Sequence, residues 1–100
     1  MKFGLVQHNI LKIQTIFLKY EKIDRVVIFG SRAIGNYRNG SYIDLTLVGN
    51  NITNEILSKI MVEIDDLNLP YLFDISIFDK LESKEFIDHI HRVGQIFYKK

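Results

Sequence analysis

Two short segments of the sequence carry residue types that can bind phosphate groups and metal ions. Residues 29–35 (FGSRAIG) close an apolar run with Gly30 and Ser31, and such a turn before a helical turn points backbone N–H groups outward. Residues 41–49 (SYIDLTLVG) alternate polar and apolar side chains and place Asp44 among the polar ones. The two segments therefore predict a phosphate-binding turn with a carboxylate near it.

A second aspartate occupies a similar position further along the chain. Residues 71–78 (YLFDISIF) alternate again, with Asp74 opposite the apolar side chains. We expect Asp44 and Asp74 on adjacent strand faces, where two carboxylates near a phosphate site suit Mg²⁺, a cation that takes oxygen ligands. Aspartates on strands are also commonly solvated or paired with Arg or Lys, and that alternative stays open here.

The glycine spacing excludes two common nucleotide-binding loops. Gly30 and Gly35 have the spacing of a Walker A loop, but Asn36 and Tyr37 follow where Lys and Ser or Thr are required. The G-x-G-x-x-G pattern of dinucleotide-binding folds is absent. A phosphate site at this turn would therefore belong to neither class.

Two arginines and two histidines need separate interpretation. Arg32, beside Ser31, could neutralise triphosphate charge, whereas Arg38 is expected to be a solvated loop residue. His89 and His91 are two positions apart on a predicted helix, so they face different directions and cannot chelate one metal ion together. We expect both histidines on the surface.

Helical periodicity predicts three helices around these segments. Apolar residues recur at spacings of three and four over residues 5–20, and again from Thr53, an N-cap residue type, to Leu67. Ser83 caps a third helix, which we expect to continue to the C-terminal lysines near the negative end of its dipole. The expected buried face of this last helix consists of Phe86, Ile90, Val93 and Phe97.

Three strands are predicted between the helices, at residues 25–29, 42–48 and 71–78. With at most one helical turn between the first two strands, the order indicates an α/β or α+β sandwich in which the apolar strand faces pack on the helices. The opposite face of the sheet, which bears Asp44 and Asp74, is expected to remain open as a cleft.

The composition is that of one ordinary globular domain covering residues 1–100. The sequence is 47% hydrophobic and 25% charged, with one proline and no cysteine. The formal net charge is only +1, so we expect no general nucleic-acid binding. Without a long apolar run, we expect no membrane segment and a cytoplasmic location.

The segment from residue 30 to residue 45, GSRAIGNYRNGSYIDL, resembles a family signature. It is similar to the motif of minimal nucleotidyltransferases of the DNA polymerase beta superfamily, G-S-x-A-x-G, five residues, then S-D-I-D-L, with a later strand that supplies a third aspartate. The matching positions are Gly30, Ser31, Ala33, Gly35, Ser41, Ile43, Asp44 and Leu45. Asp74 corresponds to the later acid, and FIDHIHRVGQIFYKK resembles the closing helix, so the likeness covers nearly the whole chain.

This resemblance implies a nucleotidyltransferase fold, with a short mixed β-sheet and helices packed on one face. It implies that the turn of Gly30 and Ser31 holds a nucleoside triphosphate, with ATP as the expected nucleotide, and Arg32 beside this turn is expected to bind the same nucleotide. It also implies that Asp44 and Asp74 are catalytic and bind Mg²⁺, so that the α-phosphate is attacked and a nucleotidyl group passes to a protein or small acceptor.

One position departs from the signature, because Tyr42 stands where the family has the first acid of its D-x-D pair. A phenol with a pKa near ~10 is neutral at physiological pH and is a poor ligand for a hard cation. We therefore expect impaired activity. The alternative that the resemblance offers is a catalytically lapsed, antitoxin-like module of a toxin–antitoxin system that binds a HEPN-type protein partner, forms a homodimer, or does both.

Overall fold

The computed structural model describes all 100 residues and is built around one mixed four-stranded sheet. The strands are β1 (Ile23–Phe29), β2 (Ile43–Gly49), β3 (Phe73–Ile77) and β4 (Gln95–Lys99). In the order β3-β2-β1-β4, β1 is antiparallel to β2 and to β4, whereas β2 is parallel to β3. The predicted α+β class and mixed sheet are confirmed.

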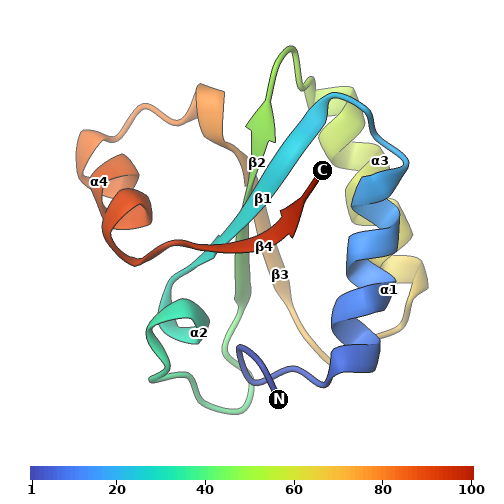
Figure 1. Ribbon diagram of the computed structural model, residues 1–100, viewed down its shortest axis with the longest axis vertical. Helices are drawn as coiled ribbons and strands as arrows, with labels where there is room; N and C mark the ends of the chain where they lie inside the picture. The colour runs from blue at the N-terminus through green and yellow to red at the C-terminus, as the bar shows by residue number, and fades with distance from the viewer.

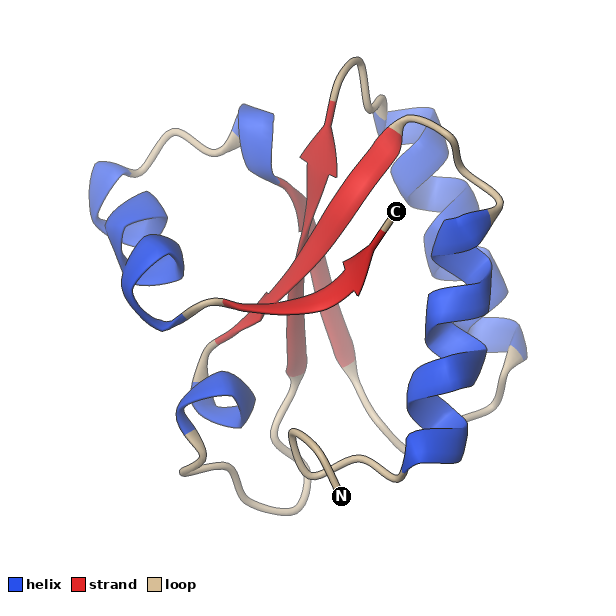
Figure 2. Ribbon diagram, in the orientation of Figure 1, coloured by secondary structure: helices blue, strands red, loops and turns tan.

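Helices flank the sheet on both sides (Figures 1 and 2). Two long helices, α1 (Gln7–Leu18) and α3 (Asn54–Asp66), lie side by side over one face. On the other side lie the single turn α2 (Ser31–Ile34) and the helix α4 (Lys84–Val93), which follows the 3₁₀ turn η1 (Phe78–Lys80). The second face is therefore partly covered by α4, and it is less open than the sequence predicted.

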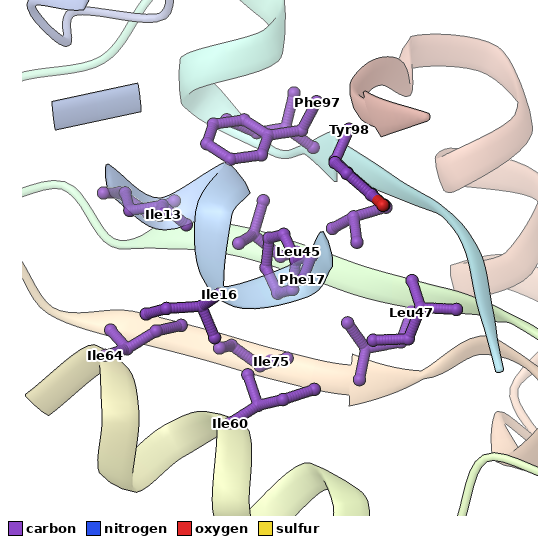
Figure 3. Packing of buried hydrophobic residues seen from close by; sticks show 14 of the residues in the cluster. Ile13, Ile16, Phe17, Leu45, Leu47, Ile60, Ile64, Ile75, Phe97 and Tyr98 are labelled. Carbon is purple, nitrogen blue, oxygen red and sulfur yellow. The ribbon is translucent and has the colours of Figure 1, made fainter. Parts of the chain in front are cut away.

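The hydrophobic core lies between the sheet and the α1–α3 pair (Figure 3). Strand alternation points Ile43, Leu45 and Leu47 of β2 into this core, where each is fully buried. The helices contribute the other half of the packing, with Ile13, Ile16, Phe17, Ile60 and Ile64. This apolar layer fixes the register of β2, because a slip by one residue would carry its whole apolar set to the opposite face.

The helix starts follow the predicted capping. Thr53 Oγ1 accepts a hydrogen bond from the backbone N–H of Ile56 at 3.2 Å, and Ser83 Oγ accepts one from Phe86 at 3.3 Å. Each bond satisfies one of the amide groups that the first turn of a helix leaves without an intrahelical partner. Both predicted N-caps are confirmed.

The end of α4 differs from the prediction. The helix stops at Val93, and Gly94 follows in an extended conformation, with φ −65° and ψ 143°. A Cβ at Gly94 would lie 2.7 Å from Cγ1 of Val27 and would overlap the carbonyl oxygen of Ile90, so only glycine allows the chain to approach β1 this closely. The expected continuation of the helix to the C-terminal lysines was therefore wrong.

The last residues instead form β4, the fourth strand, which the sequence analysis missed. Phe97 is buried as expected, but it reaches the core from a strand paired with β1. Its ring packs against Phe3 and Phe17, with centroid separations of 6.2 and 6.4 Å. Phe97 fits the helical spacing of three and four residues, but this spacing alone does not separate a helix from a short strand in this segment. Pairing with β1 decides that the segment is a strand.

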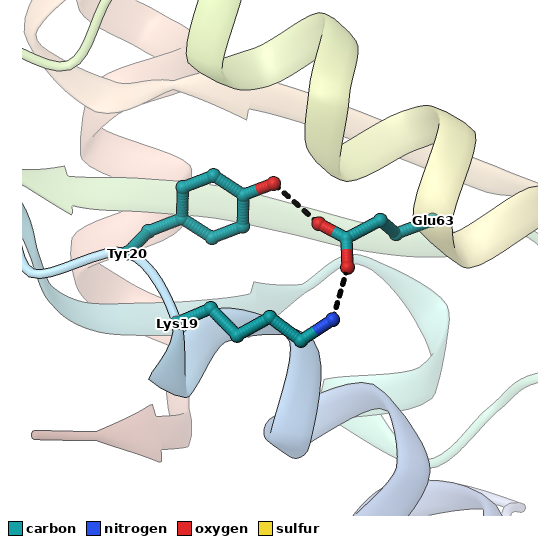
Figure 4. Close-up of polar contacts among 3 residues, drawn as sticks. All are labelled: Lys19, Tyr20 and Glu63. Atoms are coloured by element: carbon teal, nitrogen blue, oxygen red, sulfur yellow. Dashed lines mark hydrogen bonds and ion pairs between the residues drawn. The ribbon is translucent and has the colours of Figure 1, made fainter.

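A polar contact joins the end of α1 to α3 (Figure 4). The carboxylate of Glu63 accepts hydrogen bonds from Lys19 Nζ and from the hydroxyl of Tyr20. These bonds link the two helices that cover the core at the point where α1 turns toward β1.

None of the helices combines the length and the apolar composition that crossing a membrane would require.

Candidate functional site

The two aspartates singled out in the sequence are direct neighbours across the parallel β2–β3 pair. Asp44 pairs with Asp74 in the strand register, and both side chains belong to the face opposite the core. Asp44 is half-buried and Asp74 is exposed. The structure thus brings together two carboxylates from segments 30 residues apart in the sequence.

The Gly-Ser turn adjoins this pair through Gly30. This residue has φ 73° and ψ −158°, a conformation that strongly favours glycine, and it ends β1 beside β2. A Cβ at Gly30 would overlap Oδ2 of Asp44, so the bare backbone of the turn packs directly against the carboxylate. The predicted turn and the predicted acid therefore belong to one site.

The turn is held in shape by local and distant hydrogen bonds. The carbonyl of Gly30 accepts bonds from the amides of Ala33 and Ile34, at 3.2 and 3.1 Å. Gly35 ends the turn in the left-handed region, with φ 100°. The side-chain amide of Gln95 on β4 donates to the carbonyl of Ala33 at 2.8 Å. The missed strand β4 thus also supports the turn.

The electrostatic environment of Asp44 opposes its ionisation. Burial raises the pKa of the Asp44 carboxyl, and the neighbouring charge of Asp74 raises it further. His89 and Arg32 act in the opposite direction and lower the pKa of the same carboxyl, but burial and Asp74 prevail. A bound cation would relieve this repulsion, as expected of a carboxylate pair that holds a metal ion.

The next pair along the two strands carries hydroxyl groups. Thr46 is opposite Ser76 in the register, and the Ser76 hydroxyl donates to Thr46 Oγ1 at 3.0 Å. Thr46 is fully buried, so this bond satisfies a hydroxyl that would otherwise be costly to bury. The hydroxyl pair ties β2 to β3 one step beyond the aspartates and helps to hold their spacing.

His89 lies close to Asp44, which sequence reasoning missed. The residue is partly buried on α4, and its ring meets Phe29 edge to face, with the centroids 6.2 Å apart. Phe29 is the register partner of Asp44 across the β1–β2 pair. The expectation that His89 is a surface residue was therefore wrong, whereas His91 is exposed as expected. The sequence held no signal for this difference, because the packing of α4 on the sheet decides which histidine faces inward.

Arg32 is buried, with only 4% of its surface exposed, and it binds the chain itself. Its guanidinium donates to the carbonyls of Phe3 and Ser41 at 3.0–3.1 Å. It also lies over the rings of Tyr37 and Tyr71, 5.3 Å from each centroid. These contacts fasten the N-terminal segment and the 36–41 loop around α2. Direct contact of Arg32 with a nucleotide stays a prediction.

Tyr42 directly precedes β2, and 51% of its surface is exposed. No group of three or more His, Asp or Glu side chains is arranged to hold a metal ion. The donors present fit one Mg²⁺, because this ion is commonly bound by one or two carboxylates, with water and substrate phosphates completing its octahedral shell. Asp44 and Asp74 would supply those carboxylates.

The aspartate pair does not line a closed pocket. The surface has five pockets, and neither Asp44 nor Asp74 borders any of them. The cleft expected around the two aspartates is not among these pockets. The site is instead an open surface, with the two acids on β2 and β3, the Gly-Ser turn at the end of β1, and His89 on α4.

Comparison with known proteins identifies the class to which this fold and site belong. The sequence matches the family "Polymerase beta, Nucleotidyltransferase" over residues 11–100, and the chain belongs to that family. No curated protein matched the sequence. The resemblance stated from the residues is thus confirmed at the level of the family.

Solved structures agree with this assignment of the fold. The chain superposes on a toxin–antitoxin structure determined with AMP-PNP, with a TM-score of 0.73 and 15% identity. It also superposes on a mutant of the toxin–antitoxin pair MntA–HpeT, with a TM-score of 0.70 and 15% identity. Each alignment covers 96% of this chain and 75% of the other. A predicted nucleotidyltransferase from Sulfolobus solfataricus aligns with a TM-score of 0.51 and 18% identity, over 97% of this chain and 92% of that chain.

Proposed function

We propose that this nucleotidyltransferase-family chain binds a magnesium nucleoside triphosphate, ATP in the first instance, and transfers its nucleotidyl group to a protein or small acceptor with impaired efficiency. A nucleophilic atom of the acceptor forms the new bond to the α-phosphate as the bond to the β-phosphate breaks, and pyrophosphate leaves. The observation that carries the proposal is the contact between the Gly30 backbone and the Asp44 carboxylate, with Asp74 beside it. A phosphate-binding turn and a metal-binding pair are useful together only when they are adjacent. Here they lie together at one end of three neighbouring strands, β1, β2 and β3.

Each part has a defined role in this proposal. The backbone of Gly30 and Ser31 receives the phosphates, because a bare turn lets them approach the amide groups closely. Asp44 and Asp74 would hold one Mg²⁺, and the bound ion would supply positive charge to the phosphates of the nucleotide. Arg32 fixes the shape of the loop through its backbone contacts. Tyr42 occupies the position of a further metal ligand, so a second ion is held poorly and the reaction is slow.

Calorimetric titration of Mg-ATP tests the binding step. Wild type should bind ATP weakly and only with Mg²⁺, and Gly30→Ala should lose most of this affinity, because its new methyl group collides with Asp44. Gly40→Ala is the matched control. Gly40 also has a positive φ, 89°, but the space around it is open. Equal loss in both variants would assign the effect to backbone strain, and unchanged affinity in Gly30→Ala would refute the proposed phosphate turn.

A second candidate function is that of an antitoxin-like module that binds a HEPN-type partner without catalysis. Tyr42 at the first acid position favours this alternative, and two of the solved structures on which the chain superposes are described as toxin–antitoxin. Several large apolar side chains are also exposed, including Leu11 and Leu18 on α1 and Met61 and Val62 on α3. Purified chain incubated with α-labelled ATP, Mg²⁺ and a HEPN-type partner separates the two functions: label transfer supports catalysis, and complex formation alone supports the binding module. Sedimentation of the free chain reports whether it forms a homodimer.

A further inference from the structure

The aspartate pair is asymmetric in its surroundings. On one side of Asp44 lies Asp74 of β3, and on the other lies Phe29 of β1. The Phe29 ring packs against two rings of α4, those of Phe86 and His89, with centroid separations of 5.3 and 6.2 Å and edge-to-face geometry in both cases. The packing of aromatic rings thus positions the imidazole of His89 at the β1 side of the site.

Two nitrogen-bearing side chains flank this part of the site. His89 packs on Phe29, the register partner of Asp44, and the buried Arg32 belongs to the turn that follows Gly30. The donors of Arg32 are directed at backbone carbonyls. The ring nitrogens of His89, by contrast, take part in none of the side-chain hydrogen bonds of the protein, and they are not buried without a partner. Among the groups around Asp44, the imidazole is therefore the one that remains available to a ligand.

A triphosphate bound at this site would need such a donor. Its phosphates carry several negative charges, which a pair of Mg²⁺ ions would offset in a complete three-acid site. With Tyr42 in place of the first acid, the carboxylates present fit one ion. Part of the phosphate charge then has to be met by protein N–H groups, and hydrogen bonds to charged groups are among the strongest available.

We propose that His89 is a ligand-contacting residue of this site, and that its imidazole N–H donates a hydrogen bond to the phosphate groups of the bound nucleoside triphosphate. The inference rests on the proposed function and extends it to α4. It assigns the β1 side of the site to phosphate recognition and the β3 side to the metal ion. In this proposal, the aromatic contacts of Phe29 with Phe86 and His89 hold the imidazole in place.

Calorimetric titration of Mg-ATP into three variants tests this proposal. His89→Ala should weaken binding about tenfold, as expected for the loss of a hydrogen bond to a charged group. His89→Gln keeps an N–H donor and should retain affinity within about threefold of wild type. His91→Ala is the matched control, because it removes the exposed histidine of the same helix, and it should bind like wild type.

Binding of ATP and AMP and thermal unfolding together distinguish phosphate contact by His89 from a purely structural role of this residue. If the imidazole contacts phosphates, the loss in His89→Ala should be larger for ATP than for AMP. The lost contact with Phe29 should lower the unfolding temperature slightly, and to the same extent whichever nucleotide is then titrated. An equal loss for both nucleotides, or wild-type affinity in His89→Ala, would overturn the inference while Gly30→Ala still reports on the phosphate turn. If wild type itself does not bind Mg-ATP, the proposed function fails, and this inference fails with it.

Discussion

Two carboxylates of this protein have opposite surroundings. Glu63, at the α1–α3 contact, accepts hydrogen bonds from Lys19 and Tyr20, and these bonds lower the pKa of its carboxyl, with Lys19 the larger cause. The same contact raises the pKa of Tyr20 to about 12. Asp44, on the far side of the sheet, is half-buried next to another aspartate, and the pKa of its carboxyl is raised, mainly by burial.

The charge of Glu63 stabilises the fold, whereas the charge of Asp44 is available to a ligand of the candidate site. Glu63 has its partners within the protein and contributes to the packing of two helices. Asp44 bears a charge that the fold itself disfavours, and groups of this kind concentrate at functional sites. A carboxylate that costs stability is retained when an external cation supplies the missing partner. We therefore expect opposite responses when the two groups are neutralised.

The largest effect is expected from a third carboxylate next to Asp44. Tyr42→Asp should complete the acid pattern of the family and allow two Mg²⁺ ions to bind. If the missing ligand removes about 4 kcal/mol of transition-state stabilisation, nucleotidyl transfer should rise by about 10³-fold. Transfer of label from α-labelled ATP to a partner protein, together with Mg²⁺ titration, measures the change.

Tyr42→Asn is the control for this variant, because it removes the ring without adding a charge. It should leave both Mg²⁺ affinity and transfer close to wild type. If wild type already transfers label as fast as Tyr42→Asp, the tyrosine does not disable the site, and Asp44 with Asp74 suffices. If neither protein transfers label while both bind the same partner, the binding-module alternative holds.

The second largest effect is a loss of stability when the hydrogen bonds of Glu63 are weakened. Glu63→Gln should lower the free energy of unfolding by about 1 kcal/mol, since it weakens two hydrogen bonds of which one is charge-assisted. The loss is modest because Lys19 is 59% exposed and the pair is screened by solvent. Urea denaturation gives the value. Glu55→Gln, in an exposed pair with Lys59, should change stability by less than about 0.5 kcal/mol, and a loss as large as that of Glu63→Gln would contradict this account.

The third effect has the opposite sign. Asp44→Asn should raise the free energy of unfolding at neutral pH by roughly 0.2–1 kcal/mol, the range for relieving like charges directly opposite on neighbouring strands. The same variant should bind Mg²⁺ more weakly. Asp24→Asn, at an exposed position of β1, should do neither. A loss of stability in Asp44→Asn would mean that this carboxylate has a favourable partner within the fold.

The smallest effect is the pH dependence of these differences. The lowered pKa of Glu63 gives stability that is present above its ordinary value of 4.5 and is lost as the pH falls through the lower folded value. The raised pKa of Asp44 gives the opposite dependence of stability on pH. Its favourable contribution is complete below 3.8 and is lost as the pH rises through the higher folded value.

Denaturation curves recorded between about pH 3 and pH 7 test both signs. The advantage of Asp44→Asn over wild type should be full at neutral pH and should vanish toward pH 3.8. The disadvantage of Glu63→Gln should shrink only at lower pH, as the carboxyl of Glu63 becomes protonated. Parallel curves for wild type and both variants would show that neither carboxyl changes its pKa on folding.

Local residue patterns were sufficient to predict much of the fold and the main residues of the candidate site. The alternation in β2 and β3 placed Asp44 and Asp74 opposite an apolar face, because the side chains of a strand point to its two faces in turn. The Gly30–Ser31 turn and the caps at Thr53 and Ser83 follow from residues adjacent in the chain. The family signature depends on the same local spacing, and the match over residues 11–100 confirmed it.

Contacts between distant segments decided the rest. Residues 95–99 became β4 because β1 offered a free edge, and the periodicity of the segment carried no information about that edge. Arg32 is buried, and its guanidinium donates to carbonyls 29 and 9 positions away in the chain. His89 reached Asp44 only because α4 packs on Phe29. Each of these outcomes depends on which surface a partner element presents, a property of the assembled fold that no local pattern of residues specifies.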